Sequence, residues 1–150
     1  VRYVTSLLPI LFSHSSILFH NIVTSHIHPN VIYTHHQVLF ADIANFTAWS
    51  SAREPGQVFV LLENVYGAFD DIAEQRGVFK VETIGDCYMA VTGLPEPTSS
   101  HALIMCKFAR DARDCFARVS ESLEVTLGPD TGDLSVRIGL HSGPVTAGKD

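Results

Sequence analysis

The sequence has 150 residues, which suits a single domain with enough apolar content to build a hydrophobic core. Its formal net charge of −6 argues against nucleic-acid binding through phosphates, because that kind of binding needs a basic face. The three cysteines, Cys87, Cys106 and Cys115, form no CxxC pair and are odd in number. This pattern is typical of a reducing compartment rather than of a disulfide-stabilised secreted domain.

The first 37 residues differ in composition from the rest of the chain. No Asp, Glu, Lys or Arg occurs between Tyr3 and Ala41, whereas six of the eight histidines do. The apolar run from Leu7 to Val23 approaches the roughly 20 residues of a membrane-spanning helix, but a proline and two histidines interrupt it. The histidine spacing fits no metal-binding pattern, and no signal-peptidase site follows the run. We favour a leader outside the domain, residues 1–37, with a membrane span as the alternative.

The first recognisable elements are a strand and a long helix. The segment QVLFADI (37–43) is a short apolar run that ends near Asp42, as a buried strand would. Two helix starts then compete, because Ser51-x-x-Glu54 fits a capping box while Pro55 fits the first helical position if Glu54 is the cap. Apolar residues at spacings of three and four predict a helix of about six turns that ends at Gly77. These apolar residues are Val58, Leu61, Leu62, Val65, Phe69 and Ile72.

A hairpin, a second helix and a last strand follow. The segments VFKVETI (78–84) and CYMAVTG (87–93) read as strands joined by a turn at Gly85-Asp86. Ser100 can cap a helix, GPDTGD (128–133) reads as a loop, and LSVRIGLH (134–141) alternates as a fourth strand. The predicted inner face of the second helix consists of Ala102, Met105, Cys106, Ala109, Ala112, Phe116 and Val119.

The order strand, helix, strand, strand, helix, strand predicts an α+β fold. It is that of the ferredoxin-like βαββαβ arrangement, with both helices on one face of an antiparallel sheet. The first strand is then central, beside the hairpin, so that Asp42 at its end lies near Asp86 in the hairpin turn. Two carboxylates on rigid strand ends, beside a helix start, are what Mg²⁺ and a polyphosphate require.

Three segments resemble the first three signature blocks of class III nucleotide (adenylyl/guanylyl) cyclase catalytic domains. They are LFADIANFTAWSS, FKVETIGDCYMAVTGLPEP and VRIGLHSGPVTAG, in the family's order and at its spacing. The resemblance covers about residues 38–148, so we expect residues 38–150 to form the N-terminal portion of such a domain. It implies cyclisation of a nucleoside triphosphate, in which the ribose 3′-hydroxyl attacks the α-phosphate and pyrophosphate leaves, with two Mg²⁺ or Mn²⁺ ions as cofactors.

The resemblance also implies roles for individual residues. Asp42 and Asp86 would bridge both metal ions, with the carbonyl of Ile43 as a further ligand. The residues after the first strand would contact the β- and γ-phosphates through their backbone; they are Asn45, Phe46 and Thr47.

The resemblance also implies that Glu82 recognises the purine base. At this position guanylyl cyclases carry Glu, as this chain does, whereas adenylyl cyclases carry Lys. Each assignment has a structural alternative. Asp42 could cap the following helix, Asp86 could be an ordinary turn residue, and Glu82 could pair with Lys80 on the strand surface. Their joint occurrence inside three ordered motifs favours the functional interpretation.

The family's domain continues past the point that corresponds to HSGPVTAG, and that part carries the second base-reading residue and an asparagine and an arginine that stabilise the transition state. We therefore expect a C-terminally truncated guanylyl cyclase domain, with little activity alone, that forms a homodimer or a heterodimer with another cyclase domain. The alternatives are an adenylyl cyclase and an inactive cyclase-like dimerisation or regulatory module. The resemblance implies a cytoplasmic catalytic domain in intracellular signal transduction, within a parent protein that can be membrane-associated.

Overall fold

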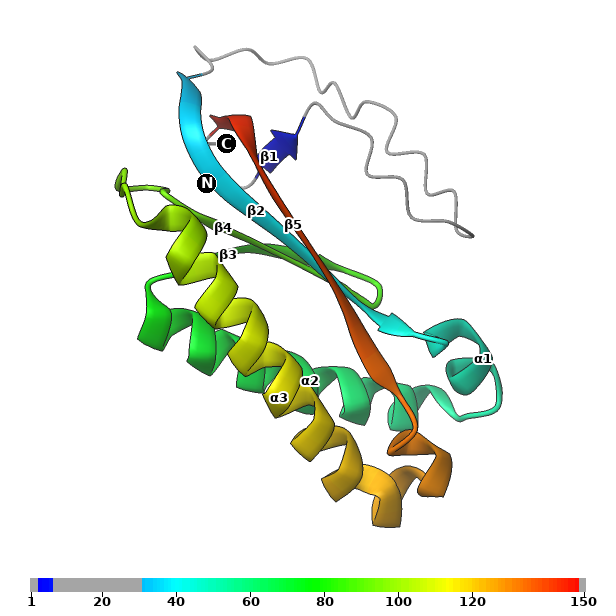
Figure 1. Cartoon of the computed structure of the whole chain (residues 1–150). Helices are drawn as coiled ribbons and strands as arrows, with labels where there is room; N and C mark the ends of the chain where they lie inside the picture. The colour runs from blue at the N-terminus through cyan, green and yellow to red at the C-terminus, as the bar shows by residue number, and fades with distance from the viewer. Residues whose placement is uncertain (1–2, 7–30, 149–150) are drawn as a thin grey trace.

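The computed structural model describes residues 3–6 and 31–148. Its strands form one antiparallel sheet in the order β1-β5-β2-β4-β3 (Figure 1). They are β1 (Tyr3–Ser6), β2 (Val31–Ala44), β3 (Phe79–Ile84), β4 (Cys87–Thr92) and β5 (Ser135–Gly148). The helices are α1 (Phe46–Ser51), α2 (Pro55–Arg76) and α3 (His101–Leu127), and a single 3₁₀ turn, η1 (Pro129–Thr131), falls in the predicted loop.

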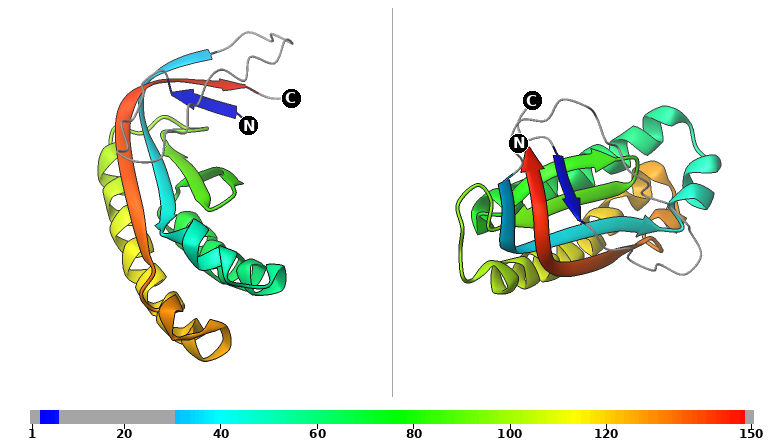
Figure 2. Two further views of the ribbon diagram at one scale, coloured as in Figure 1. Left: turned by 90° about the vertical axis from the view of Figure 1, so that its right-hand side faces the viewer. Right: turned by 90° about the horizontal axis from the view of Figure 1, so that it is seen from above.

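The expected α+β, ferredoxin-like arrangement is confirmed. Strand β2 lies between β4 and β5, as predicted for the first strand, and α2 and α3 run side by side across one face of the sheet (Figures 1 and 2). Strands β2 and β5 form a long curved ladder that reaches beyond the helices, and β1 pairs with its far end (Figure 1). The helix-free part of this ladder was not expected from the sequence.

The strand boundaries differ from the predicted ones. Strand β2 begins at Val31 rather than at residue 37, and β5 continues to Gly148, because the two strands pair from Val31 opposite Ala147 to Ala44 opposite Ser135. The leader boundary at residue 37 stays a prediction, and the run 7–23 lies outside the described residues. Among the helices that the structure describes, none is long and apolar enough to cross a membrane.

Helix α2 begins in the second of the two predicted registers. Glu54 is the N-cap and Pro55 the first helical residue, and the Glu54 N–H donates to the side-chain oxygen of Gln57 at 3.2 Å. Ser51 instead ends α1, where its hydroxyl donates to the carbonyl of Ala48 at 2.8 Å. Gly77 ends α2 with φ of 65°, a left-handed conformation that glycine adopts without a steric penalty.

The main core lies between the two long helices and the sheet. Tyr88 of β4 packs edge to face on Phe69 of α2, with ring centroids 5.4 Å apart, and Tyr66 of α2 and Phe108 of α3 also contact the Tyr88 ring. The predicted face of α3 is partly wrong, because Ala102 and Cys106 are exposed while Phe108 is fully buried. A large aromatic side chain gains more from burial than either small residue, so the helix turns Phe108 inward.

Candidate active site

Asp42 lies on the face of the sheet that the helices leave uncovered. In β2 the side chains of Leu39, Ala41 and Ile43 enter the main core. Because side chains alternate along a strand, Asp42 points to the opposite face. It pairs with Cys87 of β4 on one side and with Arg137 of β5 on the other.

Asp86 lies in the turn between β3 and β4, beside the end of β2. The turn is tight, with Ile84 paired to Cys87 and Gly85 at a φ of 60°. Burial raises the pKa of the Asp86 carboxyl, and the negative charge of Asp42 raises it further. Hydrogen bonds from the backbone N–H groups of Asp86 itself and of Ile43, and the positive charge of Arg137, lower this pKa without cancelling the rise. The structure thus brings the two predicted carboxylates together, and their role as metal ligands stays a prediction.

Arg137 is a site residue that the sequence analysis missed. Its Nε donates to Oδ1 of Asp42 at 2.8 Å and its Nη2 donates to Oδ2 at 2.9 Å. The pairing is fixed by the strand register, since the two residues lie directly opposite each other. The residue stands within the VRIGLHSG motif, but only the pairing of β5 with β2 shows that its side chain meets Asp42.

The predicted phosphate-contacting residues form the junction between β2 and α1. Asn45 adopts a left-handed conformation, with φ of 62° and ψ of 14°, and its carbonyl accepts the N–H of Trp49 at 3.0 Å. Phe46 stacks on Trp49, whereas Asn45 and Thr47 are exposed. The first N–H groups of a helix have no intrahelical acceptor, so this junction offers backbone donors close to Asp42 along the chain.

Arg53 anchors α1 to the rest of the domain. Its guanidinium lies 4.0 Å from the centroid of the Trp49 ring and donates to the carbonyls of Trp49 at 2.9 Å and of Leu127 at 3.2 Å. It also forms an ion pair with Asp130, and the Trp49 indole donates to the hydroxyl of Thr131 at 3.3 Å. The junction after β2 is therefore fixed against the C-terminal end of α3 and η1.

Glu82 lies in β3, on the same face of the sheet as Asp42. It is opposite Met89, which belongs to the smaller apolar cluster on the face away from the helices. Lys80 is opposite Ala90 of the main core, and its ammonium group donates to Asp70 of α2 at 2.6 Å, whereas the pairing irregularity that follows places Glu82 on the other face. The alternative in which Glu82 pairs with Lys80 is therefore wrong.

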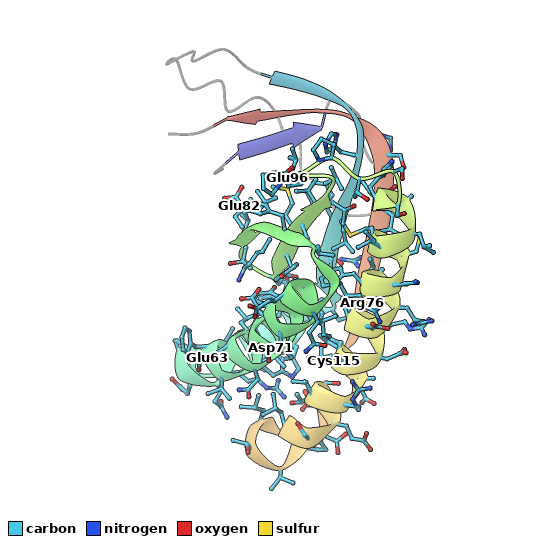
Figure 3. All side chains as sticks on the ribbon, turned by 90° about the vertical axis from the view of Figure 1, so that its left-hand side faces the viewer. Glu63, Asp71, Arg76, Glu82, Glu96 and Cys115 are labelled. Atoms are coloured by element: carbon cyan, nitrogen blue, oxygen red, sulfur yellow. The ribbon has the colours of Figure 1, made fainter. Side chains whose placement is uncertain are left out.

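Glu82 is separated from β2 by strand β4. Neighbouring strands lie about 5 Å apart, so the backbone of β3 at Glu82 is about 10 Å from the backbone of β2. Figure 3 shows it on the β3–β4 hairpin, on the far side of the sheet from Arg76 and Cys115. A base held at Glu82 and phosphates held near Asp42 would therefore require a ligand that extends across β4.

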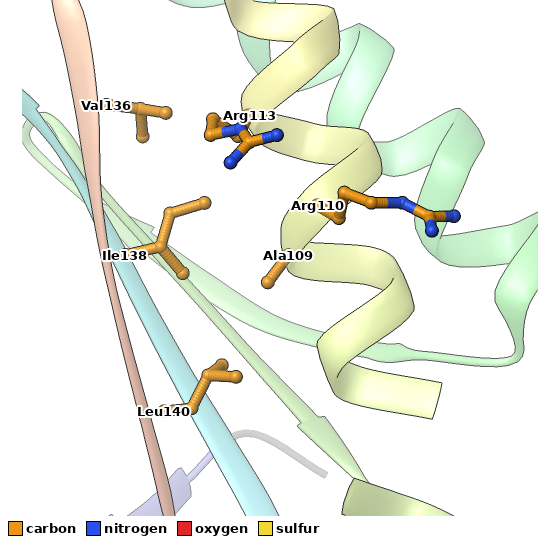
Figure 4. A pocket seen from close by; sticks show the side chains of 6 residues that line it. All are labelled: Ala109, Arg110, Arg113, Val136, Ile138 and Leu140. Atoms are coloured by element: carbon orange, nitrogen blue, oxygen red, sulfur yellow. The ribbon is translucent and has the colours of Figure 1, made fainter. Parts of the chain in front are cut away.

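A hollow between α3 and β5 lies on the other face of the sheet. Its apolar wall consists of Val136, Ile138 and Leu140 of β5, and α3 contributes Ala109, Arg110 and Arg113 (Figure 4). Val136 and Ile138 pack against the main core, so the intervening Arg137 points to the opposite face. The hollow is separate from the carboxylate pair.

The donor set of the carboxylate pair fits a hard divalent cation. The described residues contain no group of three or more His, Cys, Asp or Glu side chains that could hold a metal. Two carboxylates are nevertheless sufficient for Mg²⁺, because this ion retains water and takes further oxygen ligands from substrate phosphates. Oxygen ligands also suit Mn²⁺ and disfavour metals that prefer sulfur or nitrogen.

Comparisons with known proteins identify the family of the chain. Residues 31–150 match the sequence model of the adenylate and guanylate cyclase catalytic domain. The chain is 40% identical over 112 residues to guanylate cyclase soluble subunit beta-2 of Rattus norvegicus, which covers 74% of this chain and 15% of that protein. It is 35% identical over 116 residues to an adenylate cyclase of Mycobacterium tuberculosis, which covers 77% of this chain and 25% of that protein.

A solved structure gives the same result. The guanylate cyclase domain of RhGC from Catenaria anguillulae, determined in complex with GTP, is 39% identical and superposes with a TM-score of 0.64 over 79% of this chain and 61% of that one. The chain thus spans a minor part of these curated relatives and less than two thirds of the solved domain. On the match of its sequence, its fold and its motifs, the chain belongs to the adenylate and guanylate cyclase catalytic domain family.

Proposed function

We propose that the chain takes part in the conversion of GTP to cyclic GMP and pyrophosphate. In this reaction the ribose 3′-oxygen forms a bond to the α-phosphorus, and the bond between that phosphorus and the oxygen bridging to the β-phosphate breaks. The observation that carries the proposal is that Asp42 and Glu82 lie on one face of the sheet and that Asp86, in the β3–β4 turn, lies close to Asp42.

The phosphate end of the site is assigned to the residues around Asp42. Asp42, Asp86 and the carbonyl of Ile43 would hold two divalent ions, which when bound supply the charge that activates the 3′-hydroxyl and stabilises the triphosphate. The backbone of Asn45, Phe46 and Thr47 would orient the β- and γ-phosphates. Arg137 adds a permanent positive charge beside the carboxylates, which favours a polyanionic ligand.

The base end of the site is assigned to Glu82. Guanine presents two donors on one edge, N1–H and the 2-amino group, which one ionised carboxylate can accept together. Adenine presents an acceptor at N1, which would face the carboxylate lone pair to lone pair. A charged hydrogen bond contributes about 1.5–3 kcal/mol, so Glu82 alone would favour GTP by roughly 10- to 100-fold.

An adenylyl cyclase is the second candidate. The 35% identity to the adenylate cyclase of Mycobacterium tuberculosis extends over a similar length to the match with the guanylate cyclase subunit. We further propose that the domain acts in the cytoplasm, where GTP is supplied, and as a homodimer or heterodimer. Support for dimerisation comes from the carboxylate-bearing face, which the helices leave uncovered.

The experiment measures Mn²⁺-dependent binding of a fluorescent GTP analogue, with GTP and ATP as competitors. Asp42→Ala or Asp86→Ala should abolish the metal-dependent part, because each removes a ligand and leaves the ions facing one carboxylate. Asp114→Ala is the matched control, since Asp114 is an exposed carboxylate on α3 that pairs with Arg113. If both site variants kept wild-type affinity, the metal assignment would be wrong. Stronger competition by ATP than by GTP would favour the adenylyl candidate.

A further inference from the structure

The salt bridge between Arg137 and Asp42 occupies the oxygens to which the proposed metal ions would bind. Both carboxylate oxygens of Asp42 accept a hydrogen bond from the guanidinium, at 2.8 and 2.9 Å. This is a two-point geometry, in which a planar guanidinium fork matches a carboxylate. The ladder between β2 and β5 places the two residues directly opposite each other, so the strand register itself brings the guanidinium to the carboxylate.

We propose that Arg137 is an internal competitor for divalent metal at Asp42, so that the ion pair weakens metal binding until a polyanionic nucleotide is present. The inference rests on the proposed function, in which Asp42 and Asp86 are the metal ligands. A metal ion that approaches Asp42 must displace at least one guanidinium nitrogen, and the displaced guanidinium remains a positive charge beside the ion.

The charges of the site give the direction of this effect. Two carboxylates and one guanidinium leave a formal charge of −1, where the carboxylates alone would have −2. A divalent cation is therefore held less strongly by the site with Arg137 than by the site without it. A nucleotide triphosphate reverses the balance, because its phosphates offer the released guanidinium a new anionic partner.

The surroundings of Arg137 allow the change. Its side chain is 47% exposed, so it can leave Asp42 for solvent or for a ligand without disturbing the core. Asp42 itself is 34% exposed and accessible from the same face. Because metal and nucleotide would each favour the open arrangement, binding of one would strengthen binding of the other, as thermodynamic linkage requires.

The test compares the Mn²⁺ affinity of the wild-type chain with that of Arg137 variants in the absence of nucleotide. The concentration of free Mn²⁺ is measured from its electron paramagnetic resonance signal. Arg137→Gln should bind Mn²⁺ roughly 5- to 50-fold more tightly than the wild-type chain, the range expected for losing a half-exposed charged pair. Arg137→Lys, which keeps the charge but cannot form the two-point contact, should be intermediate. The matched control is Arg113→Gln, because Arg113 also bonds a carboxylate through Nε and Nη2, changes the net charge equally, and lies on α3.

With GTP present the order should reverse, with weaker Mn²⁺-GTP binding in Arg137→Gln than in the wild-type chain. If wild type and Arg137→Gln had equal Mn²⁺ affinity while Asp42→Asn abolished binding, the proposal that Arg137 competes with the metal would be wrong, whereas the assignment of the metal site would be retained. If Asp42→Asn and Asp86→Asn left Mn²⁺ binding unchanged, the proposed metal site would fail and the competition with it. Circular dichroism checks that each variant is folded.

Discussion

Replacement of Arg53 by alanine is expected to destabilise the domain far more than loss of a surface ion pair would. The Arg53 side chain is 8% exposed, and its guanidinium bonds the carbonyl of Leu127, the last residue of α3, and that of Trp49 in α1. The last carbonyls of a helix have no intrahelical donor, so Arg53 satisfies groups that would otherwise need water. It also stacks on the Trp49 ring.

The magnitude follows from these contacts. A fully buried acceptor left without a donor costs about 1–3 kcal/mol; the two carbonyls affected are part-buried, so the cost of each lies toward the lower end of this range. The cation–π contact adds about 0.5–2 kcal/mol. The partner carboxylate of Asp130 is 60% exposed, so that the ion pair itself contributes less than about 1 kcal/mol. Water will reach part of the space that alanine leaves, and we therefore expect a loss of about 3–4 kcal/mol in the free energy of unfolding.

Urea unfolding followed by tryptophan fluorescence is a direct assay, since Trp49, the single tryptophan, contacts Arg53. Asp130→Ala is the comparison that removes only the ion pair, with an expected loss below about 1 kcal/mol. Arg53→Lys keeps the charge but cannot bond both carbonyls in one plane, and should fall between the two. Equal losses in Arg53→Ala and Asp130→Ala would refute the reasoning, because the helix carbonyls would then contribute nothing.

Three further outcomes are expected. Glu82→Lys should erode the preference for GTP over ATP by roughly 10-fold or more in competition binding, whereas Thr83→Lys, the exposed neighbour, should leave it unchanged. Hydrogen bonds from Arg76 hold the pKa of Asp111 below its usual range, so its stabilising effect is present above the unfolded pKa of about 4 and is lost as pH falls through the folded value. Asp111→Asn should therefore destabilise at pH 7, and its difference from wild type in urea unfolding should shrink in acid. Burial, followed by the negative charges of Asp42 and Asp86, raises the pKa of the Cys87 thiol to about 11. At pH 8 iodoacetamide should therefore modify Cys87 much more slowly than the exposed Cys106 of α3, and mass spectrometry measures the two rates.

The topology and the proximity of the two carboxylates could be predicted from the sequence because local signals determine both. The Gly85-Asp86 turn fixes the hairpin, and the strand–helix order leaves the ferredoxin-like arrangement as the expected one. Asp42 then lies beside the turn once the first strand is central. The helix start at Glu54 is ambiguous from the sequence, because Ser51 is an equally suitable N-cap residue. Only the structure shows that Ser51 is the last residue of α1 and is therefore not the N-cap of α2.

The features that the sequence did not predict depend on contacts between distant segments. The partner of Arg137 depends on the register of β5 against β2, which no pattern within either strand specifies. The length of that ladder has the same origin. The inner face of α3 was misassigned in part because Met105, Ala109 and Ala112 satisfy the helical period whether Cys106 or Phe108 is inside, and only packing against Tyr88 selects Phe108.

The geometry of the site is set by side chains on the other face of the same strand. The side chains of Leu39 and Ile43 are at most 2% exposed, and their burial holds β2 in its register against β5 and β4. A shift of one residue would expose both and bury Asp42, which would desolvate a carboxylate with no partner in the core. The hydrophobic effect therefore places Asp42 opposite Arg137 and beside the hairpin turn. For the same reason, exchange of charge partners at Asp42 needs only side-chain rotation, while the strands that carry the site stay fixed.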